Sequence, residues 1–372
     1  MSIGEWKLRR RRALQLGGAF ALVSCSDNEP DDNDPPSNTA WSRWRKSPGA
    51  VLEGNFTAAD PSIVWESDQY LAIFTDLDVS VLRTVLASAT SRDGTKWDMS
   101  DNGDPFRGLA LRGREGHWDE NIESGELVHS GHDYLLYYSG YREVGHPMKG
   151  FPASIGLAIS ADGRRFSRFS DMPIIVPTEG WYDNDATYSP TVIHDGNMYV
   201  MLYAGHSYTR YDKIGQPGVY LLAATSPDGR GWTKRPTPVV APGRNDIRWM
   251  RDGAAEPCLV RGPDDRFYLF FTGLAGEERR IGVAVAASPF GPWEFNSEPI
   301  VTASGHGFDT KGAFAPSVLI KGGKARLWFH SADAARRIRI GYAEADWPIY
   351  NPTPAGARPN AELDIGTRSS PH

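Results

Sequence analysis

An internal repeat of about 65 residues constrains the fold of this chain more than any other sequence feature. Four similar turns, each beginning with a serine, lie 69, 66 and 62 residues apart; they begin at Ser91, Ser160, Ser226 and Ser288. A short apolar opening recurs five times, at residues 61–64, 125–128, 190–193, 257–260 and 316–319. Because one repeat cannot bury its own apolar face, these units are expected to pack against one another as a repeat architecture.

The unit at residues 180–232 shows what each repeat contains. Thr191–His194 and Met198–Tyr203 are β-branched and aromatic runs joined by a glycine-containing turn, which indicates a β-hairpin. A third strand is expected at Val219–Ala224 and a fourth from Trp232. Four antiparallel strands make one propeller blade, so the sequence predicts an all-β, five-bladed β-propeller of four-stranded antiparallel blades. One irregular β-sandwich is the alternative, and five aligned openings argue against it.

The N-terminal region has the pattern of a bacterial export signal. Residues 1–24 contain four arginines, Arg9–Arg12, followed by the apolar run Ala13–Val23, which is too short to span a bilayer as a helix. The segment that ends at Cys25 resembles a lipobox, in which the cysteine is lipidated, and the arginines resemble a twin-arginine signal. The sequence therefore predicts an exported protein, lipid-anchored to a bacterial membrane and facing the periplasm or the cell surface.

The chain after the signal divides into a tether and one domain. Residues 25–40 are acidic and proline-bearing, a composition that cannot bury enough surface to fold, so they are predicted to be a disordered tether. Residues 41–372 are predicted to form the single propeller domain. Cys258 is the only cysteine in this region, so no internal disulfide stabilises it. The net charge of −6 and the pI near 5.9 provide no basic surface for nucleic acid.

Candidate functional residues lie at positions where the five repeats differ in sequence. In a propeller the residue before each innermost strand faces the central axis; these residues are Asp60, Ser124, Ser189, Glu256 and Ala315. Further acids lie nearby at Glu123, Glu126, Asp185 and Asp252. Like charges in partly desolvated space raise at least one pKa, which makes an acid and base pair available. Glycosidic bond cleavage requires such a pair.

The opening Ala59-Asp60-Pro61-Ser62, the repeated Gly-Trp/Phe-Asp and Pro-Ser-Val elements and the five units resemble the five-bladed glycoside hydrolase superfamily. This superfamily includes the family 43 arabinanases and xylosidases and the family 32 and 68 fructan enzymes. The resemblance covers residues 55–350. It implies that Asp60 is the general base and that Glu256, in the fourth unit, is the general acid.

The same resemblance leaves two positions open. Family 43 has an acid-tuning Asp in the third unit, where this chain has Ser189, and Asp185 of the same loop is the substitute candidate. Glu123 has the spacing of the family's Glu-Gly-Pro acid and competes with Glu256 for that role. The predicted catalytic residues are Asp60, Glu256, Glu123 and Asp185, and the predicted substrate-binding residues are Glu126, Arg251, Asp252 and Ser189.

The expected reaction is hydrolysis of a poly- or oligosaccharide with inversion, which requires carboxyl groups ~6.5–9.5 Å apart; ~5–5.5 Å favours retention. No cofactor is expected, and no residue pair has metal-ligand spacing. His117, His206 and His330 are candidates for the cavity rim or for structural roles. The protein is expected to be a monomer that binds a carbohydrate substrate. It is expected to contact the membrane only through its lipid. A non-catalytic glycan-binding surface lipoprotein and a propeller sialidase are the alternatives, although no arginine occupies the opening positions that a sialidase needs.

Overall fold

The computed structural model describes residues 40–101, 103–142, 153–207, 218–244 and 246–352, and these residues form an all-β structure. The single helical turn among them is the 3-10 element η1 (Arg248–Met250). No described helix has the length and apolarity needed to cross a bilayer. The predicted all-β class is confirmed, whereas the export signal and Cys25 lie outside the described residues.

The strands can be divided into five groups, each paired antiparallel internally, and one parallel pairing between Val219 and Gly253 joins groups 3 and 4 into a single eight-stranded sheet. Group 1 is β2 (Ala59–Glu66), β3 (Gln69–Asp78), β4 (Arg83–Ser91) and β5 (Asp98–Met99), with β6 (Leu109–Arg112) beside β4. Group 2 is β7 (Asn121–His129), β8 (Tyr134–Tyr141), β9 (Ser154–Ser160) and β10 (Ser167–Arg168). Group 3 is β11 (Ala186–His194), β12 (Tyr199–Ser207), β13 (Gly218–Ser226) and β14 (Thr233–Lys234). Group 4 is β15 (Gly253–Arg261), β16 (Phe267–Ala275), β17 (Glu278–Ala286) and β18 (Glu294–Phe295). Group 5 is β19 (Phe314–Lys321), β20 (Lys324–Ala332), β21 (Ile338–Asp346) and β1 (Arg45–Lys46).

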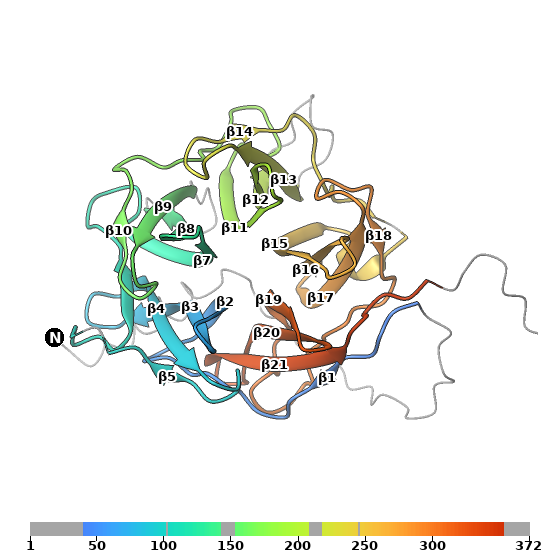
Figure 1. Cartoon of the computed structure of the whole chain (residues 1–372), viewed down its shortest axis with the longest axis horizontal. Helices are drawn as coiled ribbons and strands as arrows, with labels where there is room; N and C mark the ends of the chain where they lie inside the picture. The colour runs from blue at the N-terminus through green and yellow to red at the C-terminus, as the bar shows by residue number, and fades with distance from the viewer. Residues whose placement is uncertain (1–39, 102, 143–152, 208–217, 245, 353–372) are drawn as a thin grey trace, which may run out of the picture.

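The five groups are arranged around a common centre, and the first strand of each faces inward (Figure 1). The inner strand β2 packs against β7, β7 against β11, β11 against β15, β15 against β19, and β19 against β2 again. The last group is completed from the other end of the chain, since β1 pairs with β21 and the Asn351 N–H donates to the Ala40 carbonyl at 2.7 Å. The five predicted openings all lie on these inner strands.

Each sheet buries both of its faces, which explains why the second strands read as continuous apolar runs. On β3, Ile73 packs with Leu136 of group 2, whereas the adjacent Phe74 packs with Trp328 of group 5. Successive strand residues point to opposite faces, so neighbouring side chains reach neighbouring sheets. The core therefore consists of five apolar layers between adjacent sheets, and no sheet can be exposed without opening two of them.

Three groups share an ion pair that fixes the loop leading into the inner strand. In each, the second residue of the outermost strand is basic and pairs with a buried aspartate on that loop; the pairs are Arg168–Asp119, Lys234–Asp183 and Lys46–Asp309. The Asp119 and Asp183 side chains are fully buried. Groups 1 and 4 have Met99 and Phe295 at the same strand position. The predicted Gly-Trp/Phe-Asp element thus supplies the acidic half of this pair.

Candidate active site

Five residues with left-handed backbone surround the axis, one on each inner strand. Each lies at a bulge in the pairing of that strand and has a φ between 46° and 50°; they are Asp60, Ser124, Ser189, Glu256 and Ala315. A bulge redirects the side chain, and positive φ is costly for a residue other than glycine, so such residues concentrate at functional sites. All five line one small axial cavity, together with the proline or glycine that follows each of them. The structure thus brings together the five positions that the repeat singled out.

For four of these residues, the backbone N–H donates a hydrogen bond to a side chain of the preceding group. Each of these acceptors lies on the second strand of its own group, opposite the bulge of that group. The pairs are Ser124 with Thr75 at 3.0 Å, Ser189 with Ser139 at 2.8 Å, Ala315 with Thr272 at 2.9 Å, and Asp60 with His330 at 3.1 Å. The third group has Ala204 at this place, which offers no side-chain acceptor. These bonds connect adjacent groups and stabilise the strained backbone of the site.

Asp60 carries a carboxylate that is favoured in its ionised form. The Thr75 hydroxyl donates to Oδ2 at 2.9 Å, and Oδ1 lies 3.3 Å from Nδ1 of His330. Burial opposes ionisation of this carboxyl group, but the neighbouring His330 and Thr75 outweigh it, and the pKa of Asp60 is lowered. Asp60 is therefore an anion at neutral pH, as a general base or nucleophile must be.

Glu256 occupies the equivalent position of group 4, and its carboxyl group is shifted the other way. Its Oε2 accepts hydrogen bonds from the Thr272 hydroxyl at 2.6 Å and from the Ala315 N–H at 2.9 Å. Burial raises the pKa of Glu256, His330 lowers it and Asp60 raises it, with a raised pKa as the net result. Both hydrogen bonds use one oxygen, so Oε1 is the oxygen that is placed to carry a proton.

Glu123 precedes the axial residue of group 2 and is held by two tyrosines. The hydroxyl of Tyr141 donates to Oε1, and the hydroxyl of Tyr188, from group 3, donates to Oε2. Burial, followed by the charge of Asp60, raises the pKa of Glu123 to about 7, although the tyrosine hydroxyls oppose this rise. Asp60 thus lies close enough to both predicted acids to shift their pKa values.

Glu126 and Ser189 also lie at the axis. Glu126 lines the axial cavity, but its carboxyl group accepts hydrogen bonds from Ser62 at 2.8 Å, Thr191 at 3.0 Å and the Val192 N–H at 3.2 Å, so it links three inner strands. Burial raises its pKa to about 7. The Ser189 side chain is buried, and its hydroxyl has no hydrogen-bond partner among the described residues. Of the two, Ser189 is the one whose polar side-chain atom has no hydrogen-bond partner in the described part of the chain.

The remaining predicted residues lie on the segments that lead into β11 and β15. Asp185 precedes β11 and accepts a hydrogen bond from Asn184 at 2.9 Å; its charge acts on His206, which burial nevertheless gives a pKa of about 4. Arg251 and Asp252 are exposed and lie 3.6 Å apart, on the segment that leads into β15. These three residues do not line the axial cavity.

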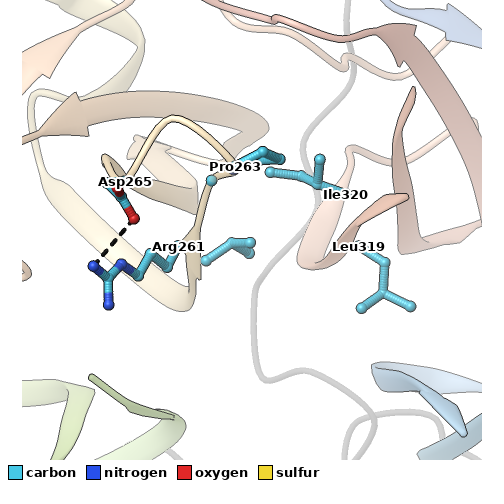
Figure 2. A pocket seen from close by; sticks show the side chains of 7 residues that line it. Arg261, Pro263, Asp265, Leu319 and Ile320 are labelled. Atoms are coloured by element: carbon cyan, nitrogen blue, oxygen red, sulfur yellow. Dashed lines mark hydrogen bonds and ion pairs between the residues drawn. The ribbon is translucent and has the colours of Figure 1, made fainter. Parts of the chain in front are cut away.

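A larger hollow lies at the opposite end of the inner strands and contains none of the candidate carboxylates. It measures about 620 Å³ and is bordered by Val260–Pro263 of the β15 end and by Leu319 and Ile320 of β19, while Arg261 pairs with Asp265 at 3.2 Å (Figure 2). The axial cavity measures only about 30 Å³, close to the volume of one water molecule. A sugar ring does not fit inside it and would have to bind above it, on the face formed by the loops that precede the inner strands.

His330, one of three histidines expected at the cavity rim or in a structural role, contacts Asp60 directly. Its imidazole is stacked on Phe314 with ring centroids 4.9 Å apart and an interplanar angle of 5°. Tyr141, Tyr188, Thr75 and Thr272 were not among the predicted site residues. Aligning the second strands by their register would have placed Thr75, Ser139, Ala204, Thr272 and His330 in one column. Within the described part of the chain, no cluster of three or more His, Cys, Asp or Glu side chains is placed to hold a metal ion.

Comparison with solved structures identifies the fold. The chain is similar to a glycoside hydrolase at a TM-score of 0.63 and 17% identity, covering 83% of this chain and 96% of that one. It is also similar to a thermostable family-43 glycoside hydrolase (TM-score 0.60, 16% identity, 83% and 98% covered). The chain has the fold of these glycoside hydrolases. A β-1,2-mannobiose phosphorylase from Listeria innocua has it as well (TM-score 0.61, 11% identity, 82% and 96% covered).

Sequence comparison is less specific. No protein-family model matches the chain. Two uncharacterized proteins of Mycobacterium tuberculosis are each 28% identical to it over 241 residues, which is 64% of this chain and 76% of each relative. The fold is therefore shared with carbohydrate-active enzymes, and the chemistry has to be inferred from the axial residues.

Proposed function

We propose that the five groups are the blades of a five-bladed β-propeller and that this protein is a glycosidase. The closed sequence of contacts among β2, β7, β11, β15 and β19 supports the propeller. The likeness to glycoside hydrolase structures supports activity on glycans. The observation that carries the chemistry is the pair Asp60 and Glu256: two carboxyl groups at equivalent axial positions, one with a lowered and one with a raised pKa. Such opposed shifts are typical of a base and an acid that share one reaction.

In the proposed reaction, Asp60 removes a proton from water while Glu256 protonates the oxygen of the leaving sugar. Glu256 is preferred to Glu123 because its Oε1 is free of the hydrogen bonds that hold Oε2, whereas tyrosine hydroxyls occupy both oxygens of Glu123. Inversion at the anomeric carbon is expected, and NMR of the first-formed product would distinguish it from retention with Asp60 as nucleophile.

The cellular setting follows from the N-terminal residues. We propose export and lipid anchoring through Cys25, with contact to the membrane through that lipid alone. A monomer without a cofactor would then act on a carbohydrate outside the cytoplasm. Metabolic labelling with a fatty-acid probe would detect the lipid, and a Cys25→Ala variant would lose the label.

The carboxylate of Asp60 is the group on which the proposed reaction depends. A panel of 4-nitrophenyl glycosides and plant or fructan polysaccharides would identify a hydrolysed substrate for testing it. Asp60→Asn should then lower kcat at least about a hundredfold, because the amide cannot accept a proton, while the melting temperature stays nearly unchanged. The matched control is Asp93→Asn, in an outer turn that does not reach the axis. Turnover near that of the wild type in Asp60→Asn would remove Asp60 from the reaction.

The same assay separates the competing functions. Running it with and without inorganic phosphate distinguishes hydrolysis from phosphorolysis, since one solved structure with this fold is a phosphorylase. The non-catalytic glycan-binding alternative is favoured by one observation, the buried and unpartnered hydroxyl of Ser189 where the resemblance expects an acid. Glycan binding without product release on long incubation would select that alternative.

A further inference from the structure

His330 has one ring nitrogen within reach of two different groups of Asp60. Nδ1 lies 3.1 Å from the backbone nitrogen and 3.3 Å from Oδ1. A ring nitrogen carries either a lone pair or a proton. With a lone pair it accepts the Asp60 N–H, and with a proton it donates to the carboxylate. It cannot do both at once.

The equivalent threonines do not face this choice. The Thr75 hydroxyl accepts the Ser124 N–H while donating to Asp60, and the Thr272 hydroxyl accepts the Ala315 N–H while donating to Glu256. A hydroxyl group has both a proton and lone pairs, so each threonine serves backbone and carboxylate together. His330 is therefore the one titratable member of this set of acceptors.

The surroundings keep the imidazole in place in both of its charge states. The stacked Phe314 ring fixes its plane, and its side chain is only 12% exposed. The charged groups that face it are Asp60 of β2, Glu256 of β15 and Glu123 of β7, all acidic. Burial lowers the pKa of His330, but these carboxylates outweigh it and raise the pKa above its ordinary value of 6.5.

We propose that His330 is a proton-operated positioning residue for Asp60. When neutral, with its proton on Nε2, it holds the Asp60 backbone N–H through Nδ1 and leaves Oδ1 free to accept a proton from water. When protonated it releases the N–H and binds Oδ1, which withdraws that oxygen from the reaction. The inference rests on the proposed function, because it assigns to His330 the loss of glycosidase activity on the acid side of the pH profile.

The activity test uses His330→Asn, whose amide can accept the N–H and donate to the carboxylate without titrating. In the wild type, kcat/KM should fall as the pH drops through the His330 midpoint. In the variant, this acid limb should move down by at least about one pH unit, toward the titration of Asp60 itself. His129→Asn is the control, since His129 pairs with Glu66 at 3.4 Å and lies at the far end of β7. An acid limb unchanged in His330→Asn would overturn the proposal.

A second measurement requires neither a substrate nor a variant, because it uses the wild-type protein alone. In NMR spectra of the wild-type protein, the Asp60 amide resonance should shift with the same midpoint as the His330 imidazole, because the N–H loses its acceptor when the ring is protonated. An Asp60 amide that stays in place while His330 titrates would overturn the proposal. If the wild type hydrolyses no glycan, the proposed function fails, and this NMR titration still decides whether His330 switches between the two Asp60 groups.

Discussion

Asp60 and Glu256 occupy the same position of the repeat. Their pKa values are shifted in opposite directions because different groups contact the two carboxyl groups. Each accepts a hydrogen bond from a threonine of its own sheet. Asp60 has in addition the imidazole of His330, whereas the second donor to Glu256 is the neutral N–H of Ala315. When it is protonated, the imidazole stabilises the Asp60 anion far more than a neutral dipole does, so the ionisation of Asp60 is coupled to that of His330.

At this scale we predict that Glu256→Gln and Glu123→Gln differ in their dependence on the leaving group. Glu256→Gln should lose at least about a hundredfold in kcat on an unactivated oligosaccharide, but much less on a 4-nitrophenyl glycoside, because nitrophenolate leaves without protonation. Glu123→Gln should affect both substrates alike, since its tyrosine-held carboxyl group acts on the charge balance of the site. The reverse pattern, measured by steady-state kinetics on both substrates, would make Glu123 the acid.

At the scale of the strands, ion pairs with buried aspartates hold three of the outermost strands to the loops that lead into the inner strands. Lys234 is 23% exposed, whereas Asp183 is fully buried and also accepts a hydrogen bond from the Tyr203 hydroxyl at 3.1 Å. Removing one partner of a buried pair leaves an uncompensated charge, which is strongly destabilising. The two-residue outer strands therefore contribute more than their length suggests.

We predict that Lys234→Met lowers the free energy of unfolding by about 3 kcal/mol, as measured by urea denaturation. The change copies the Met99 that group 1 has at the same strand position. The control Arg45→Met should stay within about 0.5 kcal/mol, because Arg45 is 57% exposed in its ion pairs. A loss as small as that of Arg45→Met would mean that the outer pair does not hold the loop.

The inner strands and their hairpins could be predicted from the sequence because the repeat marks both ends of each unit. The left-handed bulges could not be predicted, because the proline that follows four of the five residues favours extended backbone with negative φ in the residue before it, whereas these residues have positive φ. His330 and the tyrosines that hold Glu123 could not be predicted in the same way. They lie at positions without a conspicuous motif, and the partners of His330 and Tyr188 belong to other repeats, more than a hundred residues away for His330 and Asp60.

At the scale of the whole molecule, two buried carboxyl groups make stability depend on pH. The pKa values of Glu123 and Glu126 rise from 4.5 to about 7 in the folded protein. The folded state therefore keeps protons that the unfolded state has already released, and each group's contribution to stability is lost as the pH rises from about 4.5 to about 7. Below this range both states are protonated, and above it both are ionised.

Glu126→Gln isolates one of these contributions, because Glu126 lies between three inner strands and takes no part in the proposed reaction. Between about pH 4 and about pH 8, the free energy of unfolding of the wild type should fall by about 3 kcal/mol more than that of the variant. Urea denaturation at several pH values measures this difference. Parallel curves for the two proteins would show that the Glu126 proton does not distinguish the folded from the unfolded state.

The pairing of β1 with β21 has a consequence for how the chain could be rewired. Since Ala40 and Asn351 are hydrogen-bonded neighbours, a short peptide joining them would make the described fold topologically circular. Opening that circle at the exposed hairpin residue Gly131 would give a permutant that begins in group 2. This permutant would retain every strand pair and would lose only the turn between β7 and β8. The order of the five groups along the chain is thus separable from their arrangement around the common centre.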